Sequence, residues 1–367
     1  MPYHLQEHQS SESIEQELNG LFLLEDTINN SAVWGQNPKK LFSDLSEIEN
    51  FIEQNPEIKE LTDCGFAGYI SFEGKIEFGF YENLENRVHN YSSIKNQSFK
   101  SEIISPSKTK YIEAIYKCKH YIKEGDIYQA NIAHKFVVKN LDLFDSSFEI
   151  YKKLCSTNPS PSAAYYNSDD YIIVSSSPET FFEIKKYHQI SSKPIKGTCS
   201  INELDLLMSS SKEQAEHIMI VDLIRNDFGK ICQNNSIHVD NLLTIEKFTN
   251  LYHLVSTVKG YLNKYNLSQI FAALAPGGSI SGTPKKRAIE IIQELEACPR
   301  GPYTGALGYF KLNGDAKFNI LIRTLVFDKK QKEISFHTGA GITAYSDPEQ
   351  EYLETLLKAE KLISVFK

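Results

Sequence analysis

The stretch that most constrains the fold is an apolar helical segment at residues 210–229, whose apolar side chains fall on nearly every side of a helix. A helix that is apolar all round is normally buried, so we expect other elements to cover it. Ser210 or Ser211 can cap its start, and Gly229 can end it. The chain must therefore build a substantial core around this helix.

Two glutamates interrupt this apolar segment. Glu213 and Glu216 are three residues apart, which puts their Cβ atoms roughly 5–6 Å from each other on one helix face. Ile220 and Leu223 share that face, and a carboxylate in apolar surroundings needs a partner. The alternative is that Glu213 only caps the first turn, as the acidic member of a capping box.

A second pair of glutamates, Glu351 and Glu354, lies in a helix that Asp347 and Pro348 start. We expect the apolar stripe of this helix to consist of Leu353, Leu356, Leu357 and Ile363. Alone, the two glutamates are typical of a solvated charged face. Two such pairs on two helices can instead converge on a hard cation, and Mg²⁺ is the natural choice because it binds one or two carboxylates together with water and substrate oxygens.

A single lysine, Lys196, stands in the run Pro194-Ile195-Lys196-Gly197-Thr198. Proline fixes the backbone before it, and glycine permits almost any backbone angle after it. The run indicates a turn or a strand end, delivered by a hairpin of residues 181–184 and 188–195. Lys196 is then either a solvated lysine beside a turn or a held functional group.

The composition is that of a globular protein with a large core: 367 residues, 41% of them hydrophobic, and a formal net charge of -8. The negative charge argues against nucleic acid or an anionic membrane as the main partner. No apolar run approaches the roughly 18 residues of a membrane span, and residues 1–20 do not resemble a signal peptide, so we expect a cytoplasmic protein. Six scattered cysteines indicate free thiols.

Other local patterns predict a mixture of helices and strands. Residues 108–124 predict a helix that Gly125 ends, and residues 65–80 predict a strand meander. An exposed connection is expected at residues 85–106. A glycine-rich loop at 277–282 precedes a helix and offers free N–H groups to an anion.

Two further sites are indicated near the C-terminal end. Arg323 lies in an expected strand at residues 318–327, where it either pairs with an internal acid or awaits a ligand carboxylate. A glycine cluster at 339–342 is expected to follow a strand at 334–336.

Together the motifs resemble those of the chorismate-utilising enzymes, over residues 107–367. They are GDIYQAN (125–131), SPE (177–179), PIKGT (194–198), KEQAEHIMIVDLIRND (212–227), LYHLVSTV (251–258), APGGSISGTPKKRAIEII (275–292), TGALGYF (304–310), IRTL (322–325), GAGI (339–342) and EQEYLET (349–355). The resemblance implies an α+β fold of two stacked, largely antiparallel sheets flanked by helices. Residues 106–367 would form the catalytic core, and residues 1–105 a less similar part that packs on it.

The resemblance also implies roles for individual residues. Glu216 and Glu354 would bind Mg²⁺ directly, with Glu213 and Glu351 beside them, and the metal would hold the ring carboxylate of chorismate. Glu179 would protonate the departing 4-hydroxyl. The implied substrate-binding residues are Gln129, Gly197, Thr198, His253, Ser279, Gly282, Tyr303, Arg323, Gly339 and Gly341. Among these, Tyr303, Arg323 and the backbone at Gly341 would grip the enolpyruvyl carboxylate.

Two positions distinguish the branches of the family. Members that add water carry a lysine where this chain has Gln129, whereas the aminodeoxychorismate branch carries a lysine at the position of Lys196. The resemblance implies that neutral Lys196 attacks C2 of chorismate and that ammonia then enters at C4, giving 4-amino-4-deoxychorismate for para-aminobenzoate and folate synthesis.

The ammonia would come from a separate glutamine amidotransferase subunit, because no nucleophilic cysteine in a glutaminase-like context occurs in this chain. Anthranilate synthase component I is the enzymatic alternative, and a catalytically dead chorismate-binding relative is the non-enzymatic one. One departure from the family pattern is Cys199-Ser200-Ile201, which stands where Arg-Pro-Arg is common.

Overall fold

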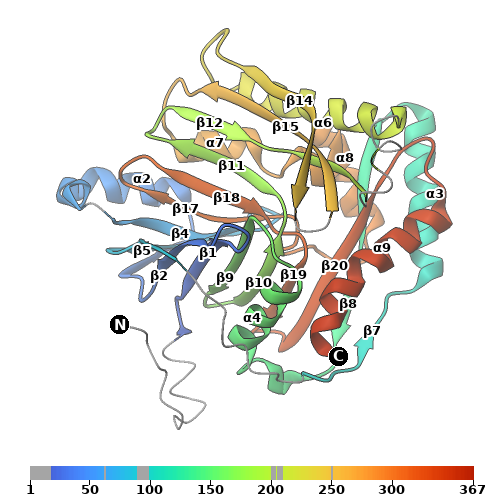
Figure 1. The fold of residues 1–367 in the computed structure, drawn as a ribbon, viewed down its shortest axis with the longest axis horizontal. Coiled ribbons are helices and arrows are strands. Elements are labelled where there is room, and N and C mark those ends of the chain that lie inside the picture. The colour runs from blue at the N-terminus through green and yellow to red at the C-terminus, as the bar shows by residue number, and fades with distance from the viewer. Residues whose placement is uncertain (1–17, 62, 89–98, 200–203, 205–209, 249–250) are drawn as a thin grey trace.

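The computed structural model describes residues 18–61, 63–88, 99–199, 204, 210–248 and 251–367. Within them the chain forms two ten-stranded sheets with helices on their outer faces (Figure 1). Every strand pair in both sheets is antiparallel. The α+β fold with two stacked antiparallel sheets, predicted from the sequence, is confirmed.

The first sheet runs in the order β16-β8-β20-β19-β10-β9-β1-β2-β6, with β7 beside β8. Its strands are β1 (Phe22–Asp26), β2 (Ser31–Gly35), β6 (Glu85–Arg87), β7 (Ile103–Ile104), β8 (Gln129–Val138), β9 (Ser162–Asn167), β10 (Tyr171–Ser177), β16 (Gly282–Thr283), β19 (Thr324–Asp328) and β20 (Glu333–Ile342).

The second sheet runs in the order β13-β15-β12-β11-β18-β17-β4-β5-β3, with β14 beside β15. Its strands are β3 (Lys40–Phe42), β4 (Gly65–Ile70), β5 (Ile76–Tyr81), β11 (Thr180–Lys185), β12 (Gln189–Ser192), β13 (Ile195–Cys199), β14 (His238–Phe248), β15 (Leu251–Tyr261), β17 (Ala306–Lys311) and β18 (Ala316–Ile320). Both sheets thus include strands from the first 105 residues.

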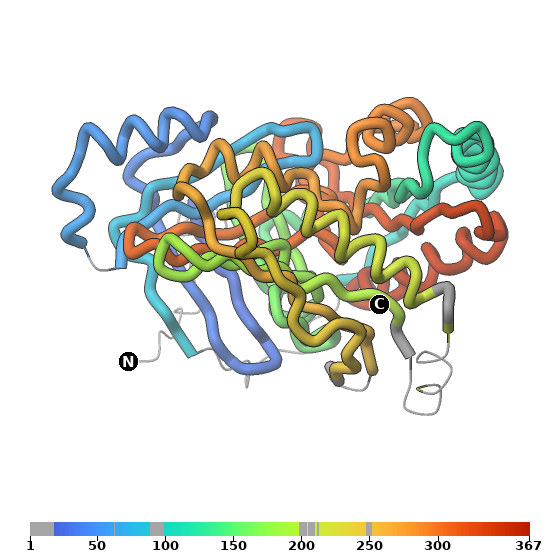
Figure 2. The backbone as a smooth tube through the Cα atoms, turned by 90° about the horizontal axis from the view of Figure 1, so that it is seen from above, coloured from blue at the N-terminus to red at the C-terminus, as the bar shows by residue number. Residues whose placement is uncertain are grey.

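The helices cover the outer faces of the two sheets (Figures 1 and 2). They are α2 (Leu45–Gln54), α3 (Lys108–Glu124), α4 (Ser147–Thr157), α6 (Ser211–Gly229), α7 (Leu267–Leu274), α8 (Lys285–Leu295) and α9 (Pro348–Ile363). α6 lies against β13 and β15, whereas α9 lies against β20 and α3. Within the described ranges, no helix combines the length and apolar character of a membrane span.

Three buried clusters hold these layers together. Phe22 and Tyr166 from the first sheet meet Tyr69 and Tyr81 from the second, which fixes the stacking of the sheets. A second cluster lies between the second sheet and α2, α6 and α7, and it continues to α3 and α8, which pack on β8 of the first sheet. A third lies between the first sheet and α4 and α9. Burial of apolar area at roughly 25 cal/mol per Å² makes these interfaces the main source of stability.

Local sequence signals predicted several elements well. Helix α3 spans the predicted residues, and Gly125 ends it with φ of 84°. β4 and β5 form the predicted meander, with Gly74 in the turn at φ of 88°. The connection predicted at residues 85–106 is exposed at Val88 and Ile104 but also contains β6 and β7.

Two predictions of helix burial are wrong. α6 is not covered all round, because Ile218 is 41% exposed and lines a surface groove while Val221 faces the core. On α9 only half of the predicted apolar stripe packs inward: Leu356 and Ile363 contact the core, but Leu353 and Leu357 are exposed and Thr355 is fully buried instead. Thr355 bonds the buried His134 of β8 at 2.9 Å, so a polar contact with the sheet fixes which face of α9 is covered.

Three strand predictions are corrected. The cluster at residues 339–342 does not follow a strand but lies inside β20, which continues to Ile342. The strand predicted at 318–327 is broken into β18 and β19, and Arg323 lies in the bend between them with φ of 50°. Lys196 does not end a hairpin but lies within β13, which pairs with β15.

Candidate active site

Lys196 is held in β13 by pairing with a strand about sixty residues further along the chain. It lies opposite Leu254 of β15, and the register shifts between Lys196 and Thr198. Gly197 stands at this bulge with φ of 59°, a conformation that glycine adopts without strain. The backbone on both sides of the half-buried Lys196 is therefore fixed. The side chain of Thr198 lies outside the described part of the structure, as do Ser200 and Ile201.

The side chain of Lys196 projects toward α6. Leu254 and Ser256 lie on the same side of β15 because they are two residues apart, and Lys196 pairs with Leu254. From α6, His217 reaches Ser256 with Nε2 and Oγ 2.7 Å apart. Burial, aided by the charge of Lys196, lowers the pKa of His217 to about 4. A neutral, fully buried imidazole thus lies close to Lys196.

Glu179 is buried in the loop between β10 and β11. The Oγ of Ser177 accepts from the N–H of Glu179 at 3.2 Å and donates to the carbonyl of Ile320 at 2.6 Å, which fixes this loop. Burial raises the pKa of the Glu179 carboxyl, opposed by a hydrogen bond with Ser279 and by the charge of Lys196. A carboxyl with a raised pKa can donate a proton near neutral pH.

The glycine-rich loop brings Gln129, Gly282 and Gly341 together. Gly282 pairs with Ala130 of β8, and a Cβ at Gly282 would overlap the carbonyl oxygen of Gln129. A Cβ at Gly341 would lie 2.5 Å from Nε2 of Gln129. Close backbone contact therefore requires glycine at position 282, whereas at position 341 the neighbour is the end of the Gln129 side chain. Ser279 of the same loop lines a cavity together with Glu179.

Arg323 belongs to a cluster of cationic side chains. Burial lowers the pKa of its guanidinium. Burial and the charge of Arg323 lower the pKa of both His253 and Lys361, so the three groups lie within electrostatic range. The backbone carbonyl of Arg323 accepts from the N–H of Ser176 at 3.1 Å, whereas its guanidinium makes no hydrogen bond or ion pair with another described residue. Of the two alternatives for Arg323, a ligand carboxylate fits this environment better than an internal acid.

The four predicted metal-site glutamates lie on α6 and α9. Ser210 caps α6 by accepting from the N–H of Glu213 at 3.3 Å, as predicted. Glu213 and Glu216 are half-buried, Glu351 is buried, and the exposed Glu354 pairs with Lys358 at 2.7 Å. In the described ranges no group of three or more His, Cys, Asp or Glu side chains is close enough to hold a metal ion. The metal site stays a prediction.

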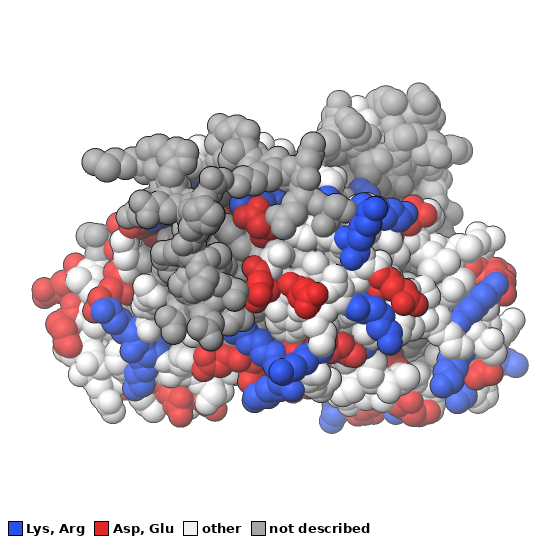
Figure 3. Space-filling view, turned by 90° about the horizontal axis from the view of Figure 1, so that it is seen from below, with Lys and Arg blue, Asp and Glu red and all other residues white. Residues whose placement is uncertain are grey.

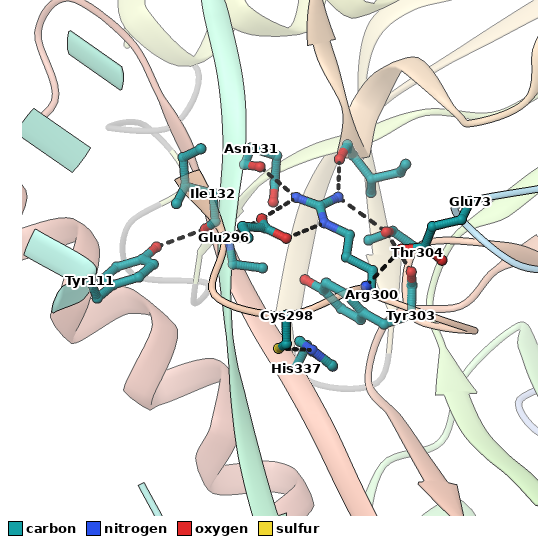
Figure 4. Close-up of polar contacts among 12 residues, drawn as sticks. Glu73, Tyr111, Asn131, Ile132, Glu296, Cys298, Arg300, Tyr303, Thr304 and His337 are labelled. Carbon is teal, nitrogen blue, oxygen red and sulfur yellow. Dashed lines mark hydrogen bonds and ion pairs between the residues drawn. The ribbon is translucent and has the colours of Figure 1, made fainter. Parts of the chain in front are cut away.

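Tyr303 lies at the start of the turn that leads into β17. It is 4% exposed, and its ring stacks on His337 with centroids 5.0 Å apart. Arg300, three residues earlier, is hydrogen-bonded on every side and links this turn to the glycine-rich loop and to β8 (Figure 4). Gly339 lies opposite Ala133 in the pairing of β20 with β8.

Sequence reasoning missed three residues of this region: His217, Lys361 and Arg300. His217 lies inside the motif at 212–227, and Lys361 is seven residues after Glu354 on the same helix face. That spacing could have predicted that Lys361 lies on the same side of α9 as Glu354. No local pattern distinguishes Arg300, because its partners come from distant segments.

Comparison with known proteins decides the family. The family described as chorismate binding enzyme matches residues 73–364. The chain belongs to the chorismate binding enzyme family. The match includes every motif from GDIYQAN to EQEYLET, and it begins within the β4–β5 hairpin, earlier than the resemblance of residues 107–367.

Similar proteins are named either as aminodeoxychorismate synthases or as anthranilate synthases. Aminodeoxychorismate synthase component 1 of Bacillus subtilis is 40% identical over 258 residues, which are 68% of this chain and 54% of that protein. An anthranilate synthase component I-like protein of Synechocystis is 38% identical over 302 residues, 80% of this chain and 61% of that protein. The chain thus spans a little over half the length of these relatives.

Solved structures of similar fold are also chorismate enzymes. Anthranilate synthase component I from Streptococcus pneumoniae superposes with a TM-score of 0.75 and 24% identity, covering 91% of this chain and 92% of that one. The menaquinone-specific isochorismate synthase of Escherichia coli gives 0.77 with 17% identity, covering 100% and 94%. At these identities the likeness shows the fold alone.

Proposed function

We propose that this chain is the chorismate-aminating component of an aminodeoxychorismate synthase. It converts chorismate and ammonia to 4-amino-4-deoxychorismate and water. The observation that carries the proposal is that Lys196, at the position where the aminodeoxychorismate branch has its lysine, lies within electrostatic range of the buried acid Glu179. The Bacillus subtilis relative with that name supports it.

In the first step the neutral amine of Lys196 forms a bond to C2 of chorismate. Both conjugated double bonds of the ring shift, and the C4–O bond breaks. Hydroxide is a poor leaving group, so Glu179 donates its proton and the 4-hydroxyl departs as water. Burial raises the pKa of Glu179, which favours the protonated form that this step requires.

In the second step ammonia forms a bond to C4. Both double bonds shift back, the bond from C2 to Lys196 breaks, and the lysine recovers its electron pair. One proton of the incoming ammonia is lost, and the carboxylate left on Glu179 takes it.

The carboxylates of α6 and α9 are hard oxygen donors, the ligand type that Mg²⁺ prefers. Glu216 and Glu354 would bind it, with Glu213 and Glu351 beside them. When bound, the ion neutralises the ring carboxylate of chorismate. On the other side of the site, Arg323 and Tyr303 would take the enolpyruvyl carboxylate, since Arg323 is a cation without a described acidic partner.

A second candidate is anthranilate synthase component I, and the Synechocystis relative favours it. In that reaction ammonia attacks C2 directly, and Lys196 has no covalent role. The product separates the two candidates. Purified protein is incubated with chorismate, Mg²⁺ and ammonium chloride, and the product is identified by mass. The proposal predicts 4-amino-4-deoxychorismate, and anthranilate with pyruvate would contradict it.

A further inference from the structure

The guanidinium of Arg300 is buried and donates hydrogen bonds only to other groups of the protein. The side chain is 1% exposed. Its Nε–H and one terminal N–H donate to the two oxygens of Glu296 at 2.9 and 2.6 Å. Its other terminal N–H groups donate to Ile280 O at 3.0 Å, Thr304 Oγ1 at 3.1 Å and Asn131 O at 2.6 Å. A guanidinium has five N–H donors, and Figure 4 shows these five engaged.

The three neutral acceptors belong to three different segments of the proposed site. Ile280 lies in the glycine-rich loop, between Ser279 and Gly282. Asn131 lies on β8, two residues after Gln129. Thr304 directly follows Tyr303 and has φ of 60°, so its turn is held against its local preference. The glycine-rich loop and β8 also pair directly, through Gly282 and Ala130, and Arg300 adds the link from both of them to the Tyr303 turn.

The ion pair of Arg300 with Glu296 extends the network. Oε1 of Glu296 also accepts from the N–H of Ala133 at 2.8 Å, a second link to β8. The carboxylate of Glu73, in the β4–β5 hairpin, accepts from the backbone N–H groups of Arg300 at 2.8 Å and Gly301 at 3.0 Å. The network thus connects the β4–β5 hairpin with β8 and the glycine-rich loop.

We propose that Arg300 is a positioning residue for chorismate: its guanidinium sets the relative placement of the glycine-rich loop, the start of β8 and the Tyr303 turn. The inference rests on the proposed use of this site for chorismate. Lysine cannot replace it, because an ammonium is a point charge with three donors and lacks the planar fork that these acceptors match. Removing the charge altogether would leave Glu296 buried and unpaired.

Two variants test this role. Arg300→Lys keeps the charge but loses the fork, and Thr304→Val keeps the shape at residue 304 but removes one acceptor. In each variant the segments joined by Arg300 can shift by a fraction of an ångström, which weakens substrate binding. Each variant should therefore raise the KM for chorismate by roughly tenfold, which corresponds to a loss of about 1.4 kcal/mol in binding free energy. Because Thr304 acts through Arg300, the effects in the double variant should not add.

A purely structural role gives a different result. It would lower the melting temperature and the amount of active protein, and therefore the apparent kcat, while the folded fraction kept its KM. Lys311→Met is the matched control, because Lys311 is a buried cation at the far end of β17 and pairs with Asp63 at 3.6 Å. It should lose stability and keep the KM for chorismate.

The outcome is decisive in each case. Folded Arg300→Lys and Thr304→Val proteins with wild-type KM and kcat would overturn the proposal, and if Arg300→Lys does not fold, Thr304→Val alone decides. KM is measured as chorismate consumption, whichever product forms, and calorimetric titration with chorismate gives Kd if turnover is absent. The identity of the wild-type product tests the proposed function separately, so the two ideas fail independently.

Discussion

Lys196 and Glu179 interact electrostatically across the site, although they belong to separate segments of the chain. Burial raises the pKa of the Glu179 carboxyl, and the charge of Lys196 opposes that rise. β13 carries the lysine, and the loop between β10 and β11 carries the acid. A nucleophile and a proton donor within electrostatic range are the two groups that displacement of a hydroxyl requires.

The pH dependence of turnover should follow Glu179. Its pKa is raised above the ordinary value of 4.5, and its acid form is the working form. The rate should therefore fall as pH rises through the raised pKa. Glu179→Gln should reduce kcat by roughly 10²- to 10⁴-fold and abolish that descending limb. Profiles of kcat between pH 5 and 9 check this, and a variant that retains the limb would assign it to another group.

Gly282→Ala should destabilise the protein. The new Cβ would overlap the carbonyl oxygen of Gln129, a backbone atom that cannot rotate away. We expect a loss of about 1–3 kcal/mol in the free energy of unfolding, measured by urea denaturation. Gly229→Ala is the control, since no atom lies within 4 Å of the position that its Cβ would take, and it should be neutral or slightly stabilising. Equal effects of both substitutions would contradict the close approach at Gly282.

Much of the architecture follows from local signals. The apolar period and the left-handed Gly125 define α3, and Asp347 caps α9 by accepting from the N–H of Gln350 at 3.0 Å. The alternating residues at 65–80 likewise predict the meander of β4 and β5. These features depend on neighbours within a few residues, so the sequence displays them directly.

Contacts between distant segments could not be predicted in the same way. Which face of α9 is buried depends on His134, which lies more than two hundred residues earlier and holds Thr355. The sequence predicts Lys196 at a turn because its partner strand β15 follows much later in the chain. The cationic cluster of Arg323, His253 and Lys361 likewise forms only when three separate elements meet.

Activity should depend on Mg²⁺ through the carboxylates of α6 and α9. Glu216→Gln and Glu354→Gln keep the side-chain volume and remove the charge that a hard cation requires. Each should lower turnover by orders of magnitude and leave the melting temperature within a few degrees of wild type. Excess EDTA should have the same effect, reversed by added Mg²⁺.

The control for this experiment lies on the same helix. Glu360 is an exposed glutamate of α9 that we assign no role, and Glu360→Gln should have wild-type turnover and wild-type Mg²⁺ dependence. Full activity of Glu216→Gln and Glu354→Gln, or full activity in EDTA, would remove the metal site from the proposed mechanism.

This chain should use ammonia but not glutamine as its nitrogen donor, unlike an enzyme that contains its own glutaminase. Purified protein should aminate chorismate with ammonium chloride, and at a fixed pH the rate should rise with the concentration of free ammonia. With glutamine it should be inactive until a glutaminase subunit is added, because a component of the proposed kind receives its ammonia from a partner. Glutamine-dependent product from the chain alone, freed of host glutaminase, would contradict this.

Covalent attachment of chorismate to Lys196 is the central claim, and intact-mass analysis during turnover tests it most directly. Wild-type protein quenched with acid should carry an adduct with the mass of chorismate less water, mapped to Lys196 by peptide sequencing. Lys196→Ala and Lys196→Arg should carry none, since guanidinium stays protonated, and any product of Lys196→Ala should shift toward 2-amino compounds. An undiminished rate of 4-amino-4-deoxychorismate formation by Lys196→Ala would contradict the covalent mechanism.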